Sequence, residues 1–156
     1  MSNVCYIEVH FYGHYLIGLE DLIKRYSLNE NVYVHDNKPF EEILKVQQNA
    51  DVLLFLDWCD PNYPGILTGK LFEYIASGRP ILCIGKAKDT CAGKLIEELG
   101  VGVSCGDDVE MIEEFLLHII KNGKWLHYNP DIEKIEYYSR ENQVKRLIKI
   151  IDEYSS

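Results

Sequence analysis

Short, mostly apolar runs alternate with amphipathic stretches along the chain. Runs of this length predict β-strands. The strand candidates are Val4–Phe11, Asn31–His35, Val52–Leu56, Ile81–Ile84 and Gly102–Cys105. Mostly apolar strands that are separated by helices are typical of a parallel sheet covered on both faces. The pattern therefore predicts a doubly wound, mainly parallel, Rossmann-like α/β domain.

The stretches between these runs carry apolar residues at helical spacing. Pro39 is expected to open one helix, Gly78 and Pro80 to stop another, and Gly100 to end a third. Asp107, followed three residues later by Glu110, resembles a capping box and predicts a further helix start. The expected helices lie around 16–26, 39–44, 71–75, 92–99, 107–119 and 139–155.

The end of the chain combines a long connection with a terminal helix. Residues 123–138 form an aromatic-rich connection, and 139–155 form the C-terminal helix of the domain. The apolar residues of that helix share one face and are expected to support homodimer contacts: Val144, Leu147, Ile148, Ile151 and Tyr154. No linker or repeat interrupts the pattern, so residues 1–156 are expected to form a single domain.

Composition and charge narrow the possible functions. A net charge of −9 argues against a nucleic-acid partner, because phosphate backbones are held by clustered basic residues. The longest aliphatic run, VLLFL, is too short to span a bilayer, and the N-terminus has no secretion-signal pattern. Five cysteines without a C-x-x-C pair favour reduced thiols over disulfides or structural zinc. We therefore expect a cytoplasmic protein.

Ligands of open α/β sheets bind at the carboxyl ends of the strands, so ligand-binding residues are expected in the segments that follow the strands. Asp57 ends a strand as the phospho-acceptor of a receiver domain does. The acidic pair after the first strand and the lysine after the last, which a receiver needs, are both missing. The alternative is that Asp57 caps a turn or contacts a ligand.

His10 and His14 have a metal-ligand spacing only on a helix, and Gly13 intervenes, so no metal site is expected.

The segment PGILTGKLFEY at 64–74 looks like a phosphate-binding loop but is not a Walker motif. The pattern G-x-x-x-x-G-K-[ST] fails at both ends, because Pro64 replaces its first glycine and Leu71 replaces its hydroxyl residue. The segment must therefore be explained without a magnesium-bound triphosphate.

Lys70 and Glu73 allow two interpretations. On one helix face they form an ion pair worth about 0.2–0.5 kcal/mol. Alternatively, Gly65 and Gly69 let the backbone approach a ligand, and the free N–H groups of the Thr68–Leu71 turn bind an anion beside Lys70. Glu73 then accepts hydrogen bonds from the two hydroxyl groups of a ribose. A diphosphate and a ribose together describe a sugar nucleotide.

The stretch ADVLLFLDWCDPNYPGILTGKLFEYIASGRPILCIG at 50–85 resembles the donor-binding half of GT-B glycosyltransferases, particularly retaining enzymes that build bacterial polysaccharides. Looser similarity extends over 31–105, and YSRENQVKRLIKIID is similar to the family's terminal helix. The resemblance implies that Glu73 binds the donor ribose and that the preceding loop and helix start hold the diphosphate and sugar. That group comprises Gly65, Ile66, Thr68, Gly69, Lys70 and Leu71. The segment His35–Pro39, including His35 and Asn37, would bracket the base.

The chain departs from the family pattern in two ways. Many members carry another acidic residue eight positions before the one that matches Glu73. This chain has Gly65 there, and the difference bears on the identity of the sugar. Complete members have two Rossmann-like domains, and only the second has a counterpart here, without its first strand and Gly-rich loop. An N-terminal acceptor domain or a partner subunit is therefore expected to complete the enzyme.

The resemblance implies a nucleotide-sugar-binding half of a glycosyltransferase. The full enzyme would transfer a sugar from a UDP- or GDP-linked donor to a glycan or lipid-linked acceptor, without a cofactor, in the cytoplasm or at the inner membrane face. This chain by itself would be inactive. Two alternatives stay open: a non-catalytic module that binds nucleotide sugars or another subunit, and half of a sugar-nucleotide epimerase.

Overall fold

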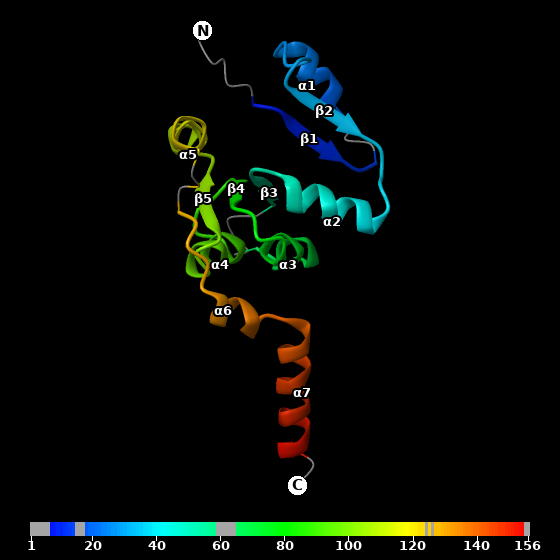
Figure 1. Cartoon of the computed structure of the whole chain (residues 1–156), viewed down its shortest axis with the longest axis vertical. Helices are drawn as coiled ribbons and strands as arrows, with labels where there is room; N and C mark the ends of the chain where they lie inside the picture. Colours follow the sequence, from blue (N-terminus) through cyan, green and yellow to red (C-terminus); the bar gives the residue numbers. More distant parts are fainter. Residues whose placement is uncertain (1–6, 15–17, 59–64, 124, 126, 155–156) are drawn as a thin grey trace. The chain divides into compact units, whose positions relative to one another are not determined.

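The computed structural model describes residues 7–14, 18–58, 65–123, 125 and 127–154. The chain divides into two compact units, Met1–Val46 and Gln47–Ser156, and each is described by itself. In both units strands alternate with helices, and all pairings between the described strands are parallel (Figure 1). The predicted Rossmann-like α/β class is confirmed, while the expectation of one domain stays a prediction.

Unit 1 contains one pair of parallel strands and a helix between them. Its elements are β1 (Val9–Tyr12), α1 (Leu19–Arg25), β2 (Val32–His35) and the first part of α2 (Phe40–Asn49). Strand β1 pairs with β2 so that Val9 lies opposite Val32. Pro39 directly precedes α2, as the sequence predicted. Residues 4–6 of the first predicted strand and Leu16 of the first predicted helix lie outside the described residues.

Unit 2 contains a three-stranded sheet in the order β3-β4-β5. Its elements are β3 (Leu53–Asp57), α3 (Gly69–Ala76), β4 (Ile81–Gly85), α4 (Cys91–Glu98), β5 (Gly102–Gly106), α5 (Val109–Asn122), α6 (Ile132–Tyr137) and α7 (Arg140–Tyr154). The strands agree with the predicted ones to within one residue at each end, because their apolar runs are bounded by turn residues.

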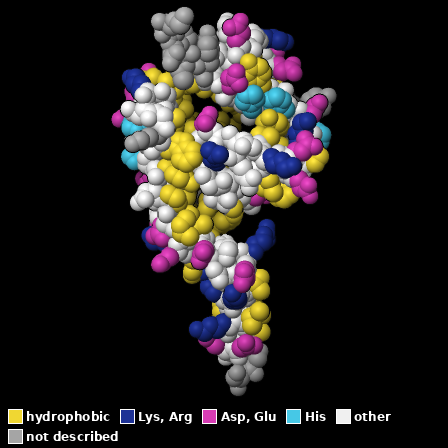
Figure 2. Space-filling view, viewed as in Figure 1, with side chains coloured by type: hydrophobic (Ala, Val, Ile, Leu, Met, Phe, Trp, Pro, Cys, Tyr) yellow, Lys and Arg dark blue, Asp and Glu magenta, His cyan; other side chains and the backbone are white. Residues whose placement is uncertain are grey.

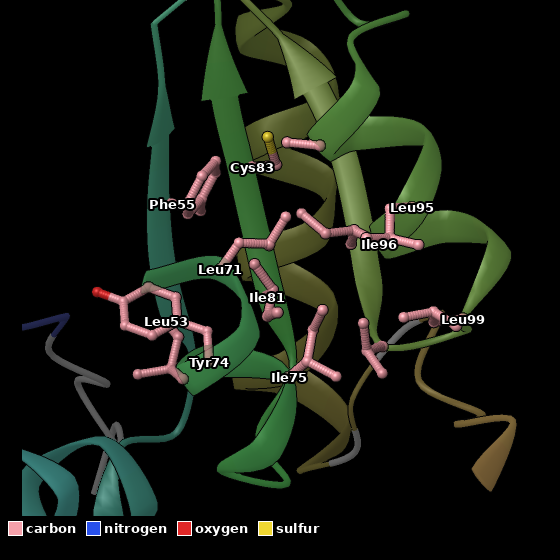
Figure 3. Close-up of a cluster of buried hydrophobic side chains, with 12 residues drawn as sticks. Leu53, Phe55, Leu71, Tyr74, Ile75, Ile81, Cys83, Leu95, Ile96 and Leu99 are labelled. Atoms are coloured by element: carbon pink, nitrogen blue, oxygen red, sulfur yellow. The ribbon is translucent and has the colours of Figure 1, made fainter. Parts of the chain in front are cut away.

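Helices cover both faces of this sheet, and alternate strand residues serve the two faces (Figure 1). Phe55, Ile81 and Cys83 pack with side chains of α3 and α4 (Figure 3). Leu82 and its neighbours on β5 pack with Phe115 of α5. Leu71 of α3 is fully buried, and burial of a leucine stabilises a fold by about 1.5–3 kcal/mol. The doubly wound arrangement predicted from the sequence is therefore present in unit 2.

The start of α5 differs from the predicted one by a residue. The N-cap is Asp108 and not Asp107, and its carboxylate accepts a hydrogen bond from the Met111 N–H at 3.0 Å. Gly106, with φ +61°, ends β5, and the Asp108 N–H then bonds to the Cys105 carbonyl oxygen in a turn. This extra turn residue moves the helix start one position further along the chain.

Helix α6 lies in the segment that was predicted to be an irregular connection. Asp131 caps it by accepting a hydrogen bond from the Lys134 N–H at 3.1 Å. The Asp131 N–H bonds to the Leu99 carbonyl oxygen at 2.9 Å, which ties the helix start to the end of α4. A helix of six residues has little periodicity to detect, and this tertiary bond is not visible in the sequence.

The terminal helix α7 is present where it was predicted, but none of its described residues is buried. It contacts α6 through Arg146, whose guanidinium carbon lies 3.5 Å from the ring centroid of Tyr137. Apolar side chains stay exposed along it, among them Leu147 at 56% (Figure 2). The expected homodimer contact through this stripe stays a prediction. Among the described helices, none is both long and apolar enough to cross a membrane.

Candidate functional site

The candidate site lies at the carboxyl edge of the sheet in unit 2. Strands β3 and β4 are parallel and in register, with Asp57 opposite Gly85, so both end at the same level. Helix α3 follows β3, and α4 follows β4. This edge is where open parallel sheets bind ligands.

The first turn of α3 is open. Thr68 is its N-cap residue, but the Thr68 side chain makes no capping hydrogen bond. The N–H groups of Gly69 and Lys70 find no acceptor among the described residues. A Cβ atom placed on Gly69 would meet no heavy atom within 4 Å. Free N–H groups and a helix dipole of about half a positive charge make such an end a binding site for an anion.

Lys70 and Glu73 do not form the ion pair that was one interpretation of their spacing. No salt bridge joins either side chain to another described residue. The Lys70 ammonium nitrogen instead lies 5.5 Å from the ring centroid of Tyr74. Lys70 is exposed and Glu73 is half-buried, so both charges can still be used by a ligand.

The remaining candidates of this loop differ in their exposure. Gly65 has φ +98° and is half-buried, whereas Ile66 is 71% exposed. Leu71 belongs to the hydrophobic core, and its N–H bonds to the Thr68 carbonyl oxygen at 3.1 Å. The amides that stay open to an anion are therefore those of Gly69 and Lys70. Residues 59–64 of the loop lie outside the described residues.

His35 and Asn37, the residues expected to bracket a base, belong to unit 1. The Nε2 atom of His35 lies 2.9 Å from the Nδ1 atom of His10, and the two rings stack with centroids 5.2 Å apart. His10 Nε2 also lies 3.3 Å from a carboxylate oxygen of Glu8. Sequence reasoning found no partner for His35. The contact could have been found from the sequence, because each of the two strands carries ring side chains two residues apart, His10 and Tyr12 on β1 and Tyr33 and His35 on β2.

In the described part of the chain, no group of three or more histidine, cysteine, aspartate or glutamate side chains is placed to hold a metal ion. His10 and His35 bond directly to each other, so one ring nitrogen of the contact is a donor and the other an acceptor. This is a pair of hydrogen-bonded side chains on a strand surface.

The cysteines of unit 2 differ in their environments. Burial raises the pKa of the Cys105 thiol above its ordinary value of 9.0, although Lys88 acts in the opposite direction. Cys105 and Cys83 are buried, and Cys91 is half-buried at the start of α4. A thiol with a raised pKa stays protonated near neutral pH and is a poor nucleophile. Cys105 therefore acts as a packing residue.

No protein-family model matches the chain, and neither a curated protein nor a solved structure matches it. The structure defines the class as a Rossmann-like α/β protein with parallel strands. Within that class, the distinctive local feature is the open start of α3 at the carboxyl edge of the sheet.

Proposed function

We propose that this chain is the nucleotide-sugar-binding half of a glycosyltransferase of the GT-B type. The observation that carries the proposal is the open first turn of α3, with two free N–H groups, an exposed lysine and a half-buried glutamate. The resemblance of residues 50–85 to the donor-binding half of that family gives the same residues the same roles.

The site suits a nucleoside diphosphate in one orientation. The diphosphate accepts hydrogen bonds from the N–H groups of Gly69 and Lys70, and the Lys70 ammonium group adds a positive charge. Glu73 accepts hydrogen bonds from the ribose hydroxyl groups. Gly69 and Glu73 are four residues apart, about 6 Å along the helix axis, so one nucleotide can reach both.

The chemistry follows from this orientation. When the bond between sugar and diphosphate breaks, negative charge grows on the departing diphosphate, and the open helix end stabilises it. The acceptor is held by an N-terminal domain or a partner subunit, so the chain by itself binds the donor without turning it over. The whole enzyme works in the cytoplasm, where nucleotide sugars are its donors.

Titration calorimetry with UDP and GDP tests the proposal. Wild type is expected to bind one of them, and Glu73→Gln to bind it about 10 to 100 times more weakly, the loss of a hydrogen bond to a charged group. The matched control is Glu98→Gln, which alters an exposed glutamate on α4 and should leave the affinity unchanged. The proposal is wrong if wild type binds neither nucleotide at millimolar concentration, or if both variants bind equally well.

A further inference from the structure

A buried carboxylate oxygen that has no hydrogen-bond partner among the described residues lies at the same edge of the sheet. Asp57 is the last residue of β3, and its Oδ2 atom is buried. No described residue offers this oxygen a hydrogen bond. A buried acceptor without a donor costs free energy, so folded proteins rarely keep one unless it has a use. The expectation that Asp57 caps a turn does not account for this oxygen.

Two glycines make room for Asp57. A Cβ atom at Gly85 would lie 2.6 Å from the Asp57 carbonyl oxygen and 3.3 Å from its Cβ atom, so only glycine fits there. Gly65 lies near the carboxylate itself. A Cβ atom at Gly65 would lie 3.9 Å from Oδ2 of Asp57, and φ of +98° disfavours any side chain at this position. At Gly65 the chain therefore places no side chain of its own in the space beside the carboxylate.

A backbone nitrogen also lies near the Cβ position at Gly65. The position of a Cβ atom at Gly65 lies 3.8 Å from the backbone nitrogen of Cys91, the first residue of α4, and 3.7 Å from Cβ of Thr90. The Thr90 hydroxyl already accepts a hydrogen bond from the Gly93 N–H. The Cβ position at Gly65 is thus within 4 Å of both a carboxylate oxygen and the backbone nitrogen of a helix start.

These surroundings select the chemistry of an occupant. The carboxylate repels a phosphate group. A hydroxyl group both donates and accepts, so it can bond to Asp57 and to the Cys91 N–H at once. Among the parts of a nucleotide sugar, the sugar carries such hydroxyl groups in addition to the ribose.

We propose that Asp57 binds a hydroxyl group of the donor sugar in the space beside Gly65, with the Cys91 N–H donating to the same oxygen. The inference rests on the proposed function and adds a sugar-binding residue to it. A sugar hydroxyl group supplies Oδ2 with the donor that it lacks among the described residues. A polar group that only the correct hydroxyl satisfies discriminates strongly against ligands that lack it.

The test compares nucleotides with and without a sugar. Calorimetry is carried out with UDP, UDP-glucose, UDP-galactose and UDP-N-acetylglucosamine, and with GDP and GDP-mannose, on wild type, Asp57→Asn and Asp51→Asn. Asp51 is an exposed aspartate just before the same strand and is the matched control. Urea unfolding of each variant without ligand is the second readout.

Wild type is expected to bind one nucleotide sugar more tightly than its parent nucleotide. The affinity of Asp57→Asn for that nucleotide sugar should be about tenfold lower than the affinity of wild type. Its affinity for the parent nucleotide should equal that of wild type. Without ligand it should be at least as stable as wild type, because an amide carries no buried charge. Asp51→Asn should match wild type in affinity for both ligands.

Three results would overturn the inference: none of the four nucleotide sugars binds wild type more tightly than its parent nucleotide, Asp57→Asn keeps the full gain in affinity, or Asp57→Asn weakens the binding of the nucleotide and of its sugar derivative equally. If UDP or GDP binds and Glu73→Gln removes that binding, the proposed function stands although this inference has failed. If wild type binds no nucleotide, both fail together.

Discussion

Helices α3 and α4 are both preceded by a threonine in an extended conformation, but their first turns differ. Thr68 precedes α3 with φ −91° and ψ 156°, and Thr90 precedes α4 with φ −81° and ψ 164°. Thr90 is buried, and its hydroxyl oxygen accepts a hydrogen bond from the Gly93 N–H at 2.9 Å. Thr68 is exposed and makes no such bond. The same residue type in the same backbone conformation thus closes one helix start and leaves the other open.

The first-turn glycines show the same contrast. A Cβ atom at Gly93 would overlap Oγ of Ser104 and would lie 2.7 Å from the Lys88 carbonyl oxygen, so this glycine lets α4 pack closely on its neighbours. A Cβ atom at Gly69 would touch nothing. Gly93 therefore serves the packing of the fold, whereas Gly69 leaves space at a surface where a ligand can approach the backbone.

The glycine contrast gives the largest expected effect. Gly93→Ala should lower the free energy of unfolding by about 1–3 kcal/mol, because the added methyl group overlaps backbone atoms. Gly69→Ala should be neutral or stabilise by up to about 1 kcal/mol, since the methyl group has room and alanine favours a helix. Urea unfolding of the two variants measures the difference. Equal losses in both would mean that the two helix starts are not distinct.

The lysine of the open helix start should matter for binding and not for folding. Lys70→Ala is expected to weaken UDP or GDP binding about tenfold at low salt, because a charge-assisted contact to phosphate is lost. Lys94→Ala, which alters an exposed lysine in the first turn of α4, is the control and should bind as wild type does. Calorimetry at two salt concentrations measures both, and the Lys70 effect should shrink as salt increases. An equal loss in both variants would argue for a general effect of charge.

The two threonines should differ in their contribution to stability. Thr90→Ala removes a capping hydrogen bond and should cost about 0.5–2 kcal/mol of unfolding free energy. Thr68→Ala removes no capping bond and should leave the free protein unchanged to within about 0.5 kcal/mol. Thermal unfolding of the variants provides the comparison. A cost at Thr68 as large as that at Thr90 would show that the first turn of α3 is closed in solution.

The smallest expected effect is a decrease of the unfolding free energy at high pH, caused by Cys105 and Tyr128 in unit 2. Burial raises the pKa of Cys105 above 9.0 and that of Tyr128 above 10.0. The folded state therefore favours both protonated forms. Their contribution to stability is complete below pH 9 and is lost as the pH rises through the raised values, because the unfolded chain releases its protons first. Urea unfolding between pH 8 and pH 10.5 should show this decline, and Cys105→Ala should make it smaller.

Much of the fold could be predicted from the sequence because its signals are local. The apolar runs that became β3, β4 and β5 are bounded by turn residues, and Pro39 and Gly100 mark helix ends. The segment of Gly69, Lys70 and Glu73 was also recognisable, since glycine, lysine and an acid at a helix start have a clear chemical use. Helix α6 was missed because its start depends on a bond from Asp131 to the end of α4.

The sequence by itself determined the order of strands and helices and their parallel arrangement. Periodicity and turn residues act between neighbours in the chain, so they can be read without coordinates. Only the tertiary structure decided which helix start is open, that Leu71 is buried, that His10 contacts His35, and that no described residue donates to Oδ2 of Asp57. Each of these depends on residues far apart in the chain, because burial and hydrogen-bond partners are properties of the packed chain.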